Sequence, residues 1–249
     1  MIACGRVRLG NSPQSSSMGV SMAVSDSVRS DSADSAGLAI TRIPSSRARI
    51  VCIGDSITHG DTGLGFNAPR PWPEQVGEML GVEVFNCGHN GIEAARYREC
   101  PEWELAKSKL PGADLVTFML GTNDIGHDFV TSPDDVPAHI ARYVGLIEEA
   151  AALTPHAEVA VLSIIQFALG EPVMSRFGLE GMRRMNVLVD ELNPAYRRMC
   201  REHGWHFVDF AAAINQHRDL YGNSIHPNQD GYDVMARVLA PRLSALLGA

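Results

Sequence analysis

The chain has 249 residues, of which 45% are hydrophobic and 20% charged, as in a globular protein that buries a sizeable core. Its formal net charge of −8 argues against a nucleic-acid partner, because proteins that bind a phosphate backbone carry a basic stripe. No apolar run approaches the roughly 20 residues of a membrane-spanning helix, so we expect a soluble protein without a membrane partner.

The five cysteines are widely spaced, and no two form a C-x-x-C pair. Their odd number and their spacing argue against both a disulfide framework and a zinc knuckle. Cys52 and Cys87 lie in apolar runs, where a thiol usually behaves as a small buried hydrophobe. We therefore expect a reducing compartment and a cytoplasmic location.

Residues 1–47 differ in composition from the rest of the chain. About one residue in three is serine between Asn11 and Ser46, without an apolar period, and such a segment cannot repay the entropy of ordering. The start also lacks the apolar core of a secretory signal. We predict a flexible extension over residues 1–47 and one folded domain over residues 48–249.

From residue 49 onward, short apolar runs alternate with helical patterns. In chain order we predict a strand at 49–53, a helix at 71–80, strands at 82–86 and 114–120, a helix at 134–152, a strand at 158–165, a helix at 182–203, a strand at 205–210 and a helix at 229–247. Strands that are apolar on both faces and alternate with helices indicate an α/β sandwich with a parallel sheet. In such folds the chemistry gathers at the carboxyl ends of the strands.

The first predicted strand runs into Gly54-Asp55-Ser56. A serine at a strand-to-helix turn can present its hydroxyl at the sheet edge, and its backbone N–H points into the same site. Taken alone, these three residues are better explained as a turn in which the serine caps a helix.

Two further strands end in loops that suit an oxyanion site. Residues 86–91 contain two glycines, and the N–H of Gly91 is unobstructed by a side chain. Asn123 follows the next strand and can aim its amide at a developing negative charge, although an ordinary turn explains it too. The glycine spacing does not fit the dinucleotide fingerprint, so we expect no nucleotide cofactor.

His226 precedes a proline in the loop before the last helix, which holds it in an extended conformation. It is placed to act as a general base toward Ser56. His203 and His206 flank a corner where a helix has already ended, so we expect no metal site there. Asp55 and Asp124 are expected to hold their turns through bonds to the backbone.

Together, the four blocks GDSITHG, NCGHNG, GTND and NSIHPNQDGY resemble those of the SGNH (GDSL-type) hydrolase family of esterases and lipases. The resemblance covers residues 49–249 and implies a catalytic domain with a flavodoxin-like, three-layer α/β/α sandwich and a five-stranded parallel sheet. It implies a serine esterase acting on small acyl esters, acetyl or short-chain, without cofactor or metal. Ser56 would be the nucleophile and His226 the base. The N–H groups of Ser56 and Gly91 and the Asn123 side chain would form the oxyanion hole.

The sequence departs from the family pattern at one position. An aspartate usually stands three residues before the histidine, and here that residue is Asn223. A neutral amide can accept a bond from the imidazole but helps the imidazolium far less. Ser56 and His226 could work as a dyad, oriented by Asn223 or a backbone carbonyl. Alternatively, Asp209 or Asp219 supplies the carboxylate, or the position is degenerate or engineered and activity is low.

Two loops border the expected site. Phe66 and Trp72 follow the nucleophile, and Phe167, Met174 and Phe177 follow the fourth strand. These residues could form substrate walls or a lid, but ordinary loop packing or an oligomer contact fits equally, so a homo-oligomer stays open.

Asn223 also leaves open a second class of function, because a fold does not guarantee an activity. The chain could be a weakly active or non-catalytic binding module for acylated glycans or lipids. Within the enzyme class, a carbohydrate deacetylase, a thioesterase and a lysophospholipase stay as alternatives, since pocket shape separates them.

Overall fold

The computed structural model describes residues 47–170, 176–215 and 217–248, which belong to one compact unit. The predicted flexible extension over residues 1–47 lies outside the described residues, apart from Arg47. The proposed domain boundary at residue 48 therefore stays a prediction.

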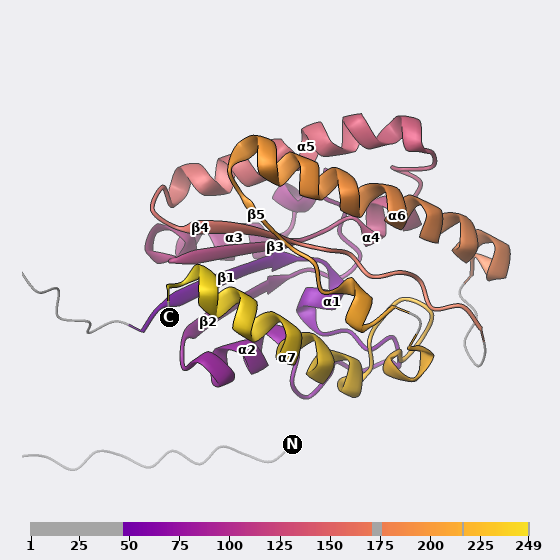
Figure 1. The fold of residues 1–249 in the computed structure, drawn as a ribbon, viewed down its shortest axis with the longest axis horizontal. Helices are drawn as coiled ribbons and strands as arrows, with labels where there is room; N and C mark the ends of the chain where they lie inside the picture. The colour runs from indigo at the N-terminus through magenta and orange to yellow at the C-terminus, as the bar shows by residue number, and fades with distance from the viewer. Residues whose placement is uncertain (1–46, 171–175, 216, 249) are drawn as a thin grey trace, which may run out of the picture. The chain divides into compact units, whose positions relative to one another are not determined.

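One parallel sheet of five strands forms the centre of the described unit, in the order β2-β1-β3-β4-β5 (Figure 1). The strands are β1 (Arg49–Gly54), β2 (Glu83–Gly88), β3 (Leu115–Met119), β4 (Glu158–Leu162) and β5 (His206–Val208). This is the flavodoxin-like strand order, so the predicted fold class is confirmed. The order reverses between β1 and β3, and ligands bind at such a point in α/β sheets.

Helices cover both faces of the sheet (Figure 1). They are α1 (Ser56–His59), α2 (Trp72–Leu80), α3 (Pro101–Lys109), α4 (Thr122–Gly126), α5 (Val136–Leu153), α6 (Gly178–His203) and α7 (Gln229–Leu246). Val51 and Ile53 of β1 pack into the core shared with α3, α5 and α6, whereas Ile50 and Cys52 face the core shared with α2 and α7. Burial on both faces explains why the strands are apolar throughout.

The sequence did not predict α1, α3 or α4. Two of them are short, with four residues in α1 and five in α4, and they occupy the motif loops that were read as turns. In α3 the buried residues are only Trp103 and Ala106, so no continuous apolar stripe marks this helix.

The fourth and fifth strands are shorter than the runs 158–165 and 205–210 predict. The Ser163 N–H still donates to the Val208 carbonyl of β5 at 3.0 Å, but from Ile164 onward side chains of α6 supply backbone partners. Asn193 exchanges two hydrogen bonds of 2.9 Å with the backbone of Ile164, and Asn186 exchanges bonds of 2.7 and 2.9 Å with that of Phe167. The segment after β4 stays buried, which explains why its residues are apolar although they do not form a strand.

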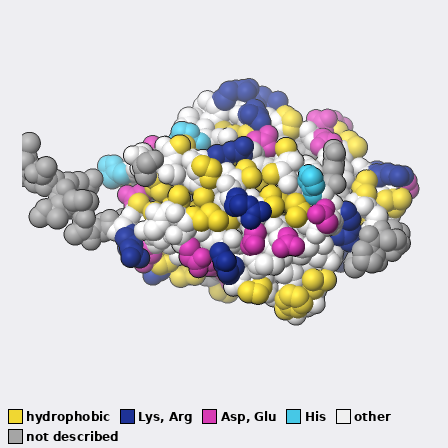
Figure 2. Space-filling view, turned by 60° about the horizontal axis from the view of Figure 1, so that its bottom comes forward, with side chains coloured by type: hydrophobic (Ala, Val, Ile, Leu, Met, Phe, Trp, Pro, Cys, Tyr) yellow, Lys and Arg dark blue, Asp and Glu magenta, His cyan; other side chains and the backbone are white. Residues whose placement is uncertain are grey.

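The surface carries charges of both signs. Figure 2 shows Lys and Arg side chains lying among Asp and Glu side chains on one face. Within the described part of the chain, no helix combines the length and the apolar character that crossing a bilayer requires.

Candidate active site

Two glycines bring the ends of β1 and β2 against α1. A Cβ atom at Gly54 would lie 2.1 Å from the Thr58 hydroxyl oxygen, and one at Gly88 would lie 2.2 Å from the backbone nitrogen of His59. Both distances are too short for any side chain, so only glycine allows α1 to pack this closely against the two strand ends. Ser56 is the first residue of α1.

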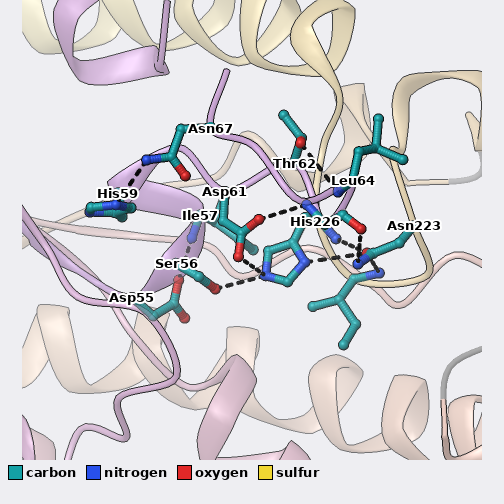
Figure 3. Close-up of polar contacts among 12 residues, drawn as sticks. Asp55, Ser56, Ile57, His59, Asp61, Thr62, Leu64, Asn67, Asn223 and His226 are labelled. Carbon is teal, nitrogen blue, oxygen red and sulfur yellow. Dashed lines mark hydrogen bonds and ion pairs between the residues drawn. The ribbon is translucent and has the colours of Figure 1, made fainter. Parts of the chain in front are cut away.

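Ser56 and His226 meet at the carboxyl edge of the sheet. The Ser56 hydroxyl oxygen lies 2.9 Å from Nε2 of His226, although one residue follows β1 and the other precedes α7. Figure 3 shows the imidazole ring with Ser56 and Asp61 on its Nε2 side and Asn223 on its Nδ1 side. A hydroxyl hydrogen-bonded to an imidazole is the geometry of an activated serine.

Asn223 presents its amide oxygen to the imidazole. This oxygen lies 3.3 Å from Nδ1 of His226 and accepts bonds from the N–H groups of Ile225 and His226 at 2.7 and 2.8 Å. The amide nitrogen donates to the Gly63 carbonyl at 3.4 Å, which distinguishes oxygen from nitrogen in this side chain. A carbonyl-type oxygen can only accept, so Nδ1 carries the proton and Nε2 is free to accept one from Ser56.

The carboxylate nearest the ring in the described contacts belongs to Asp61, which the sequence analysis did not select. Its Oδ2 lies 3.9 Å from Nε2 of His226. The two carboxylates considered from sequence lie elsewhere: Asp209 pairs with Arg197 at 2.8 Å, and no contact joins Asp219 to the ring. The interpretation that either one replaces the missing aspartate is wrong, because in the described contacts neither carboxylate touches the His226 ring.

Burial is the main influence on the charge of His226. Removal from water lowers the pKa of its imidazole, and the nearby Asp61 carboxylate opposes this by raising it; the net pKa is lowered. The ring is therefore neutral at neutral pH, as a base must be before it accepts the serine proton.

Ile92 brings Gly91 and Asn123 close together, because it follows Gly91 in the chain and contacts the Asn123 side chain. The Asn123 side-chain amide donates to the Ile92 carbonyl at 3.1 Å, and Gly91, with a φ of +75°, directly precedes Ile92. One amide hydrogen of Asn123 is thereby engaged, which leaves the second for a ligand. This arrangement is compatible with a shared oxyanion site.

Asp55 holds its own turn, as expected, by accepting a bond from the Ile57 N–H at 3.0 Å. The expectation for Asp124 is wrong, because its carboxylate bonds to the distant Ala94 N–H at 2.9 Å and contacts Nδ1 of His139 at 3.1 Å. Burial raises the pKa of the Asp55 carboxyl to about 7, and the Asp124 charge adds to the rise.

A cavity of about 260 Å³ lies between the Asn123 segment and the loop that precedes His226. It is lined by Thr122, Asn123, Gly126, His127, Phe167, Arg176, Phe177, Asn223, Ser224 and Ile225. Phe167 and Phe177, two of the predicted wall residues, are among them, whereas Met174 lies outside the described residues.

The other two predicted wall residues lie away from this cavity. Phe66 is 59% exposed and does not line it. Trp72 is fully buried in the core shared with α2 and α7, so its assignment to a substrate wall is wrong. Trp72 is the first residue of α2 and lies on the same inward face as Val76, so its ring packs in the core.

Two polar groups near the site were not found from sequence. His127 contacts the buried Glu93 at 2.6 Å and lines the cavity. His127 follows Asn123 by four residues, about one helical turn, and this spacing could have identified it from the sequence.

Among the described residues, His89, Cys100 and Glu102 hold three metal-ligating atoms within 4.8 Å of one another. His89 and Glu102 already satisfy each other at 2.5 Å. His203 and His206, considered from sequence as a pair, contact different glutamates.

Comparison with known proteins decides the family. The profile of the GDSL-like Lipase/Acylhydrolase family matches residues 52–234. The chain belongs to this family. It is a hydrolase of acyl esters, and the predicted family and enzyme class, a carboxylic ester hydrolase, are confirmed. A comparison with curated proteins gives no match.

Solved structures show the same fold at low identity. A carbohydrate acetylesterase family member from Sinorhizobium meliloti is 22% identical with a TM-score of 0.65, covering 81% of this chain and 100% of that one. The native aryl esterase of M. smegmatis is 23% identical with a TM-score of 0.63, covering 80% and 99%. A lipolytic G-D-S-L protein from Veillonella parvula is 23% identical with a TM-score of 0.58, covering 78% and 97%. At these identities the likeness establishes the fold alone.

Proposed function

We propose that this family member is a serine esterase that hydrolyses small acyl esters, acetyl or short-chain, through an acyl-enzyme. The observation that carries the proposal is the 2.9 Å contact between the Ser56 hydroxyl and Nε2 of the half-buried His226. A cavity of about 260 Å³, lined by Asn123 and by the loop that precedes His226, supports a small substrate.

In the proposed reaction, His226 takes the Ser56 proton as the serine oxygen attacks the ester carbonyl. The N–H groups of Ser56 and Gly91 and the Asn123 amide stabilise the oxyanion. The tetrahedral intermediate collapses to the acyl-serine, and the alcohol leaves with the proton from His226. Water then attacks the acyl-serine by the same route and releases the acid.

Asp61 supplies the negative charge that Asn223 lacks. Once protonated, the imidazolium has the Asp61 carboxylate 3.9 Å from Nε2, whereas Asn223 orients Nδ1 through a neutral oxygen. Asn223 also donates to Gly63, two residues after Asp61, which an aspartate at position 223 could not do. The Asn223 amide thus orients the ring, while the Asp61 carboxylate supplies the charge from the other side of the ring.

The cytoplasmic location stays a proposal. Among the described cysteines, Cys52, Cys87, Cys100 and Cys200 are free and buried, which suits a reducing compartment but does not require it.

Replacing the nucleophile tests the proposed function. We expect Ser56→Ala to lower kcat for p-nitrophenyl acetate by at least about 1,000-fold, because the acyl-enzyme can no longer form. Unchanged turnover in a folded variant would refute the mechanism.

A serine-reactive phosphonate separates the esterase from the non-catalytic binding module. We expect the phosphonate to react with the activated serine in a 1:1 ratio. Mass spectrometry should locate the label at Ser56, and the Ser56→Ala variant serves as the unlabelled control. A wild-type protein that stays unlabelled would favour the binding module.

A further inference from the structure

Three side chains of different chemistry meet where β2 ends and α3 begins. His89 directly follows β2, Cys100 directly precedes α3, and Glu102 lies in the first turn of that helix. Each offers one ligand atom, and these nitrogen, sulfur and oxygen atoms lie within 4.8 Å of one another. None of the three residues takes part in the proposed reaction, so the cluster is separate from the catalytic pair.

Contacts with the surrounding backbone hold the cluster in place. The N–H of His89 donates to the Gly54 carbonyl at 3.0 Å. The Cys100 thiol donates to the Tyr97 carbonyl at 3.0 Å, and the Tyr97 hydroxyl in turn donates to the carbonyl of Cys87 in β2. These bonds join the end of β2 to the start of α3, so the protein itself positions the three ligand atoms.

The spacing of these atoms fits a tetrahedral ion after a small movement. Zinc lies about 2.0–2.3 Å from nitrogen, oxygen and sulfur ligands, so two of its ligand atoms lie about 3.3–3.8 Å apart. Nδ1 of His89 lies 2.5 Å from a Glu102 carboxylate oxygen, and these two atoms must separate by about 1 Å to admit the ion. Both side chains are partly exposed, at 34% and 28%, which gives them room to move and lets the ion enter from solvent.

The kinds of ligand atom indicate which metal binds. A thiolate, an imidazole and a carboxylate together suit Zn²⁺, whereas Mg²⁺ and Ca²⁺ take oxygen ligands. The thiol proton leaves to solvent on binding. The Cys100 thiolate and the Glu102 carboxylate then balance the two positive charges of the ion. The position of Cys100 directly before α3 favours this state, because helix N-termini stabilise thiolates.

We infer that His89, Cys100 and Glu102 form a Zn²⁺ site with three protein ligands and a water molecule in the fourth position. Bound zinc ties α3 to the loop that carries Gly91, two residues after His89. The inference goes beyond the proposed function, because the esterase reaction does not use the ion.

Binding of Co²⁺ and Zn²⁺ to the reduced, full-length protein tests the site. Co²⁺ takes the tetrahedral geometry of zinc, and a cobalt–thiolate bond gives a charge-transfer band in the near ultraviolet. We expect one equivalent of Co²⁺ to produce this band and Zn²⁺ to displace it, since zinc binds such sites more tightly. Zinc at about 100 times its dissociation constant should raise Tm by about 5–10 °C.

Two variants identify the ligands. Cys100→Ser should remove the charge-transfer band, because no thiolate then reaches the ion. Glu102→Gln retains an oxygen that can accept from His89 but loses the negative charge, and it should weaken zinc binding at least about 10-fold. Because Glu102 is partly exposed, this variant gives an answer even where replacing the buried cysteine prevents folding.

Matched controls separate the site from adventitious binding. Cys200→Ser removes another buried cysteine, and His206→Ala removes another histidine that contacts a glutamate, at 2.7 Å. Both variants should bind Co²⁺ as the wild type does, and loss of the band in either one would overturn the inference.

Three further results would overturn it. They are no band in the wild type, a band that survives in Cys100→Ser, and unchanged zinc affinity in Glu102→Gln. Turnover of p-nitrophenyl acetate is measured separately, with a chelator present. Failure of the zinc site therefore leaves the proposed esterase intact, and failure of the esterase leaves the zinc site intact.

Discussion

A single charge near His226 affects how readily its ring holds the serine proton. Two unit charges about 4 Å apart interact by about 1 kcal/mol in water and about 4 kcal/mol at an effective dielectric constant of about 20. The Asp61 side chain is 28% exposed and the His226 side chain 14%, so the interaction lies between these values, nearer the lower one.

We therefore expect Asp61→Asn to lower kcat by about 5- to 30-fold, because the imidazolium loses its nearest negative charge. The same change removes the influence that raises the His226 pKa, so the acid limb of the kcat/KM profile should move to lower pH. Rates measured from pH 4 to 9 test both effects. A lower rate with an unmoved acid limb would assign Asp61 a purely structural part.

Asn223→Asp should have the opposite effect. A carboxylate on the Nδ1 side favours the protonated ring, so kcat should rise and the acid limb should move to higher pH. The gain should be larger when Asp61 is already Asn, because one charge then replaces the other. Equal gains in the two backgrounds would show that the two positions act independently.

The sequence identifies Ser56 and His226 but not Asp61, and the reason is spatial. Asp209 and Asp219, the carboxylates that the sequence suggests, lie near His226 along the chain. Asp61 reaches the ring only because the loop after α1 folds back, with its carbonyl accepting a bond from Tyr232 of α7. A contact of this kind leaves no local pattern in the sequence.

At the scale of elements, side chains of α6 form hydrogen bonds with backbone groups that a neighbouring strand would otherwise satisfy. Asn186 and Asn193 both satisfy backbone groups of the segment after β4. A run of apolar residues signals burial but not the hydrogen-bonding partner, which is why the predicted strand was too long. The long helices were found because their apolar faces repeat over several turns.

Asn186→Leu should therefore lower the free energy of unfolding by roughly 2–4 kcal/mol, since the N–H and carbonyl of buried Phe167 both lose their partner. Urea denaturation gives the value. The neighbouring Val187 is 57% exposed, and Val187→Ala should change stability by less than about 0.5 kcal/mol. Similar effects of both changes would mean that the Asn186 bonds contribute little.

At the scale of the whole molecule, Asp55 links stability to pH. Its folded-state pKa is about 7, above the roughly 3.9 of an unfolded aspartate. Between these values the folded protein binds more protons than the unfolded one, so the contribution of Asp55 to stability falls as pH rises from about 4 to about 7.

Asp55→Asn keeps an acceptor for the Ile57 N–H but removes this titration. The stability of the variant relative to wild type should increase with pH by at most about 1.4 kcal/mol per unit between pH 4 and 7, and stay level above pH 7. Denaturant curves at pH 5, 6, 7 and 8 measure it. A difference that does not vary with pH would show that Asp55 has an ordinary pKa.

The site also joins early and late parts of the chain, because Ser56 follows the first strand whereas His226 and Tyr232 belong to the last loop and helix. The nucleophile and its base are 170 residues apart along the chain, so a chain in which the last loop and α7 have not yet docked carries an inert serine.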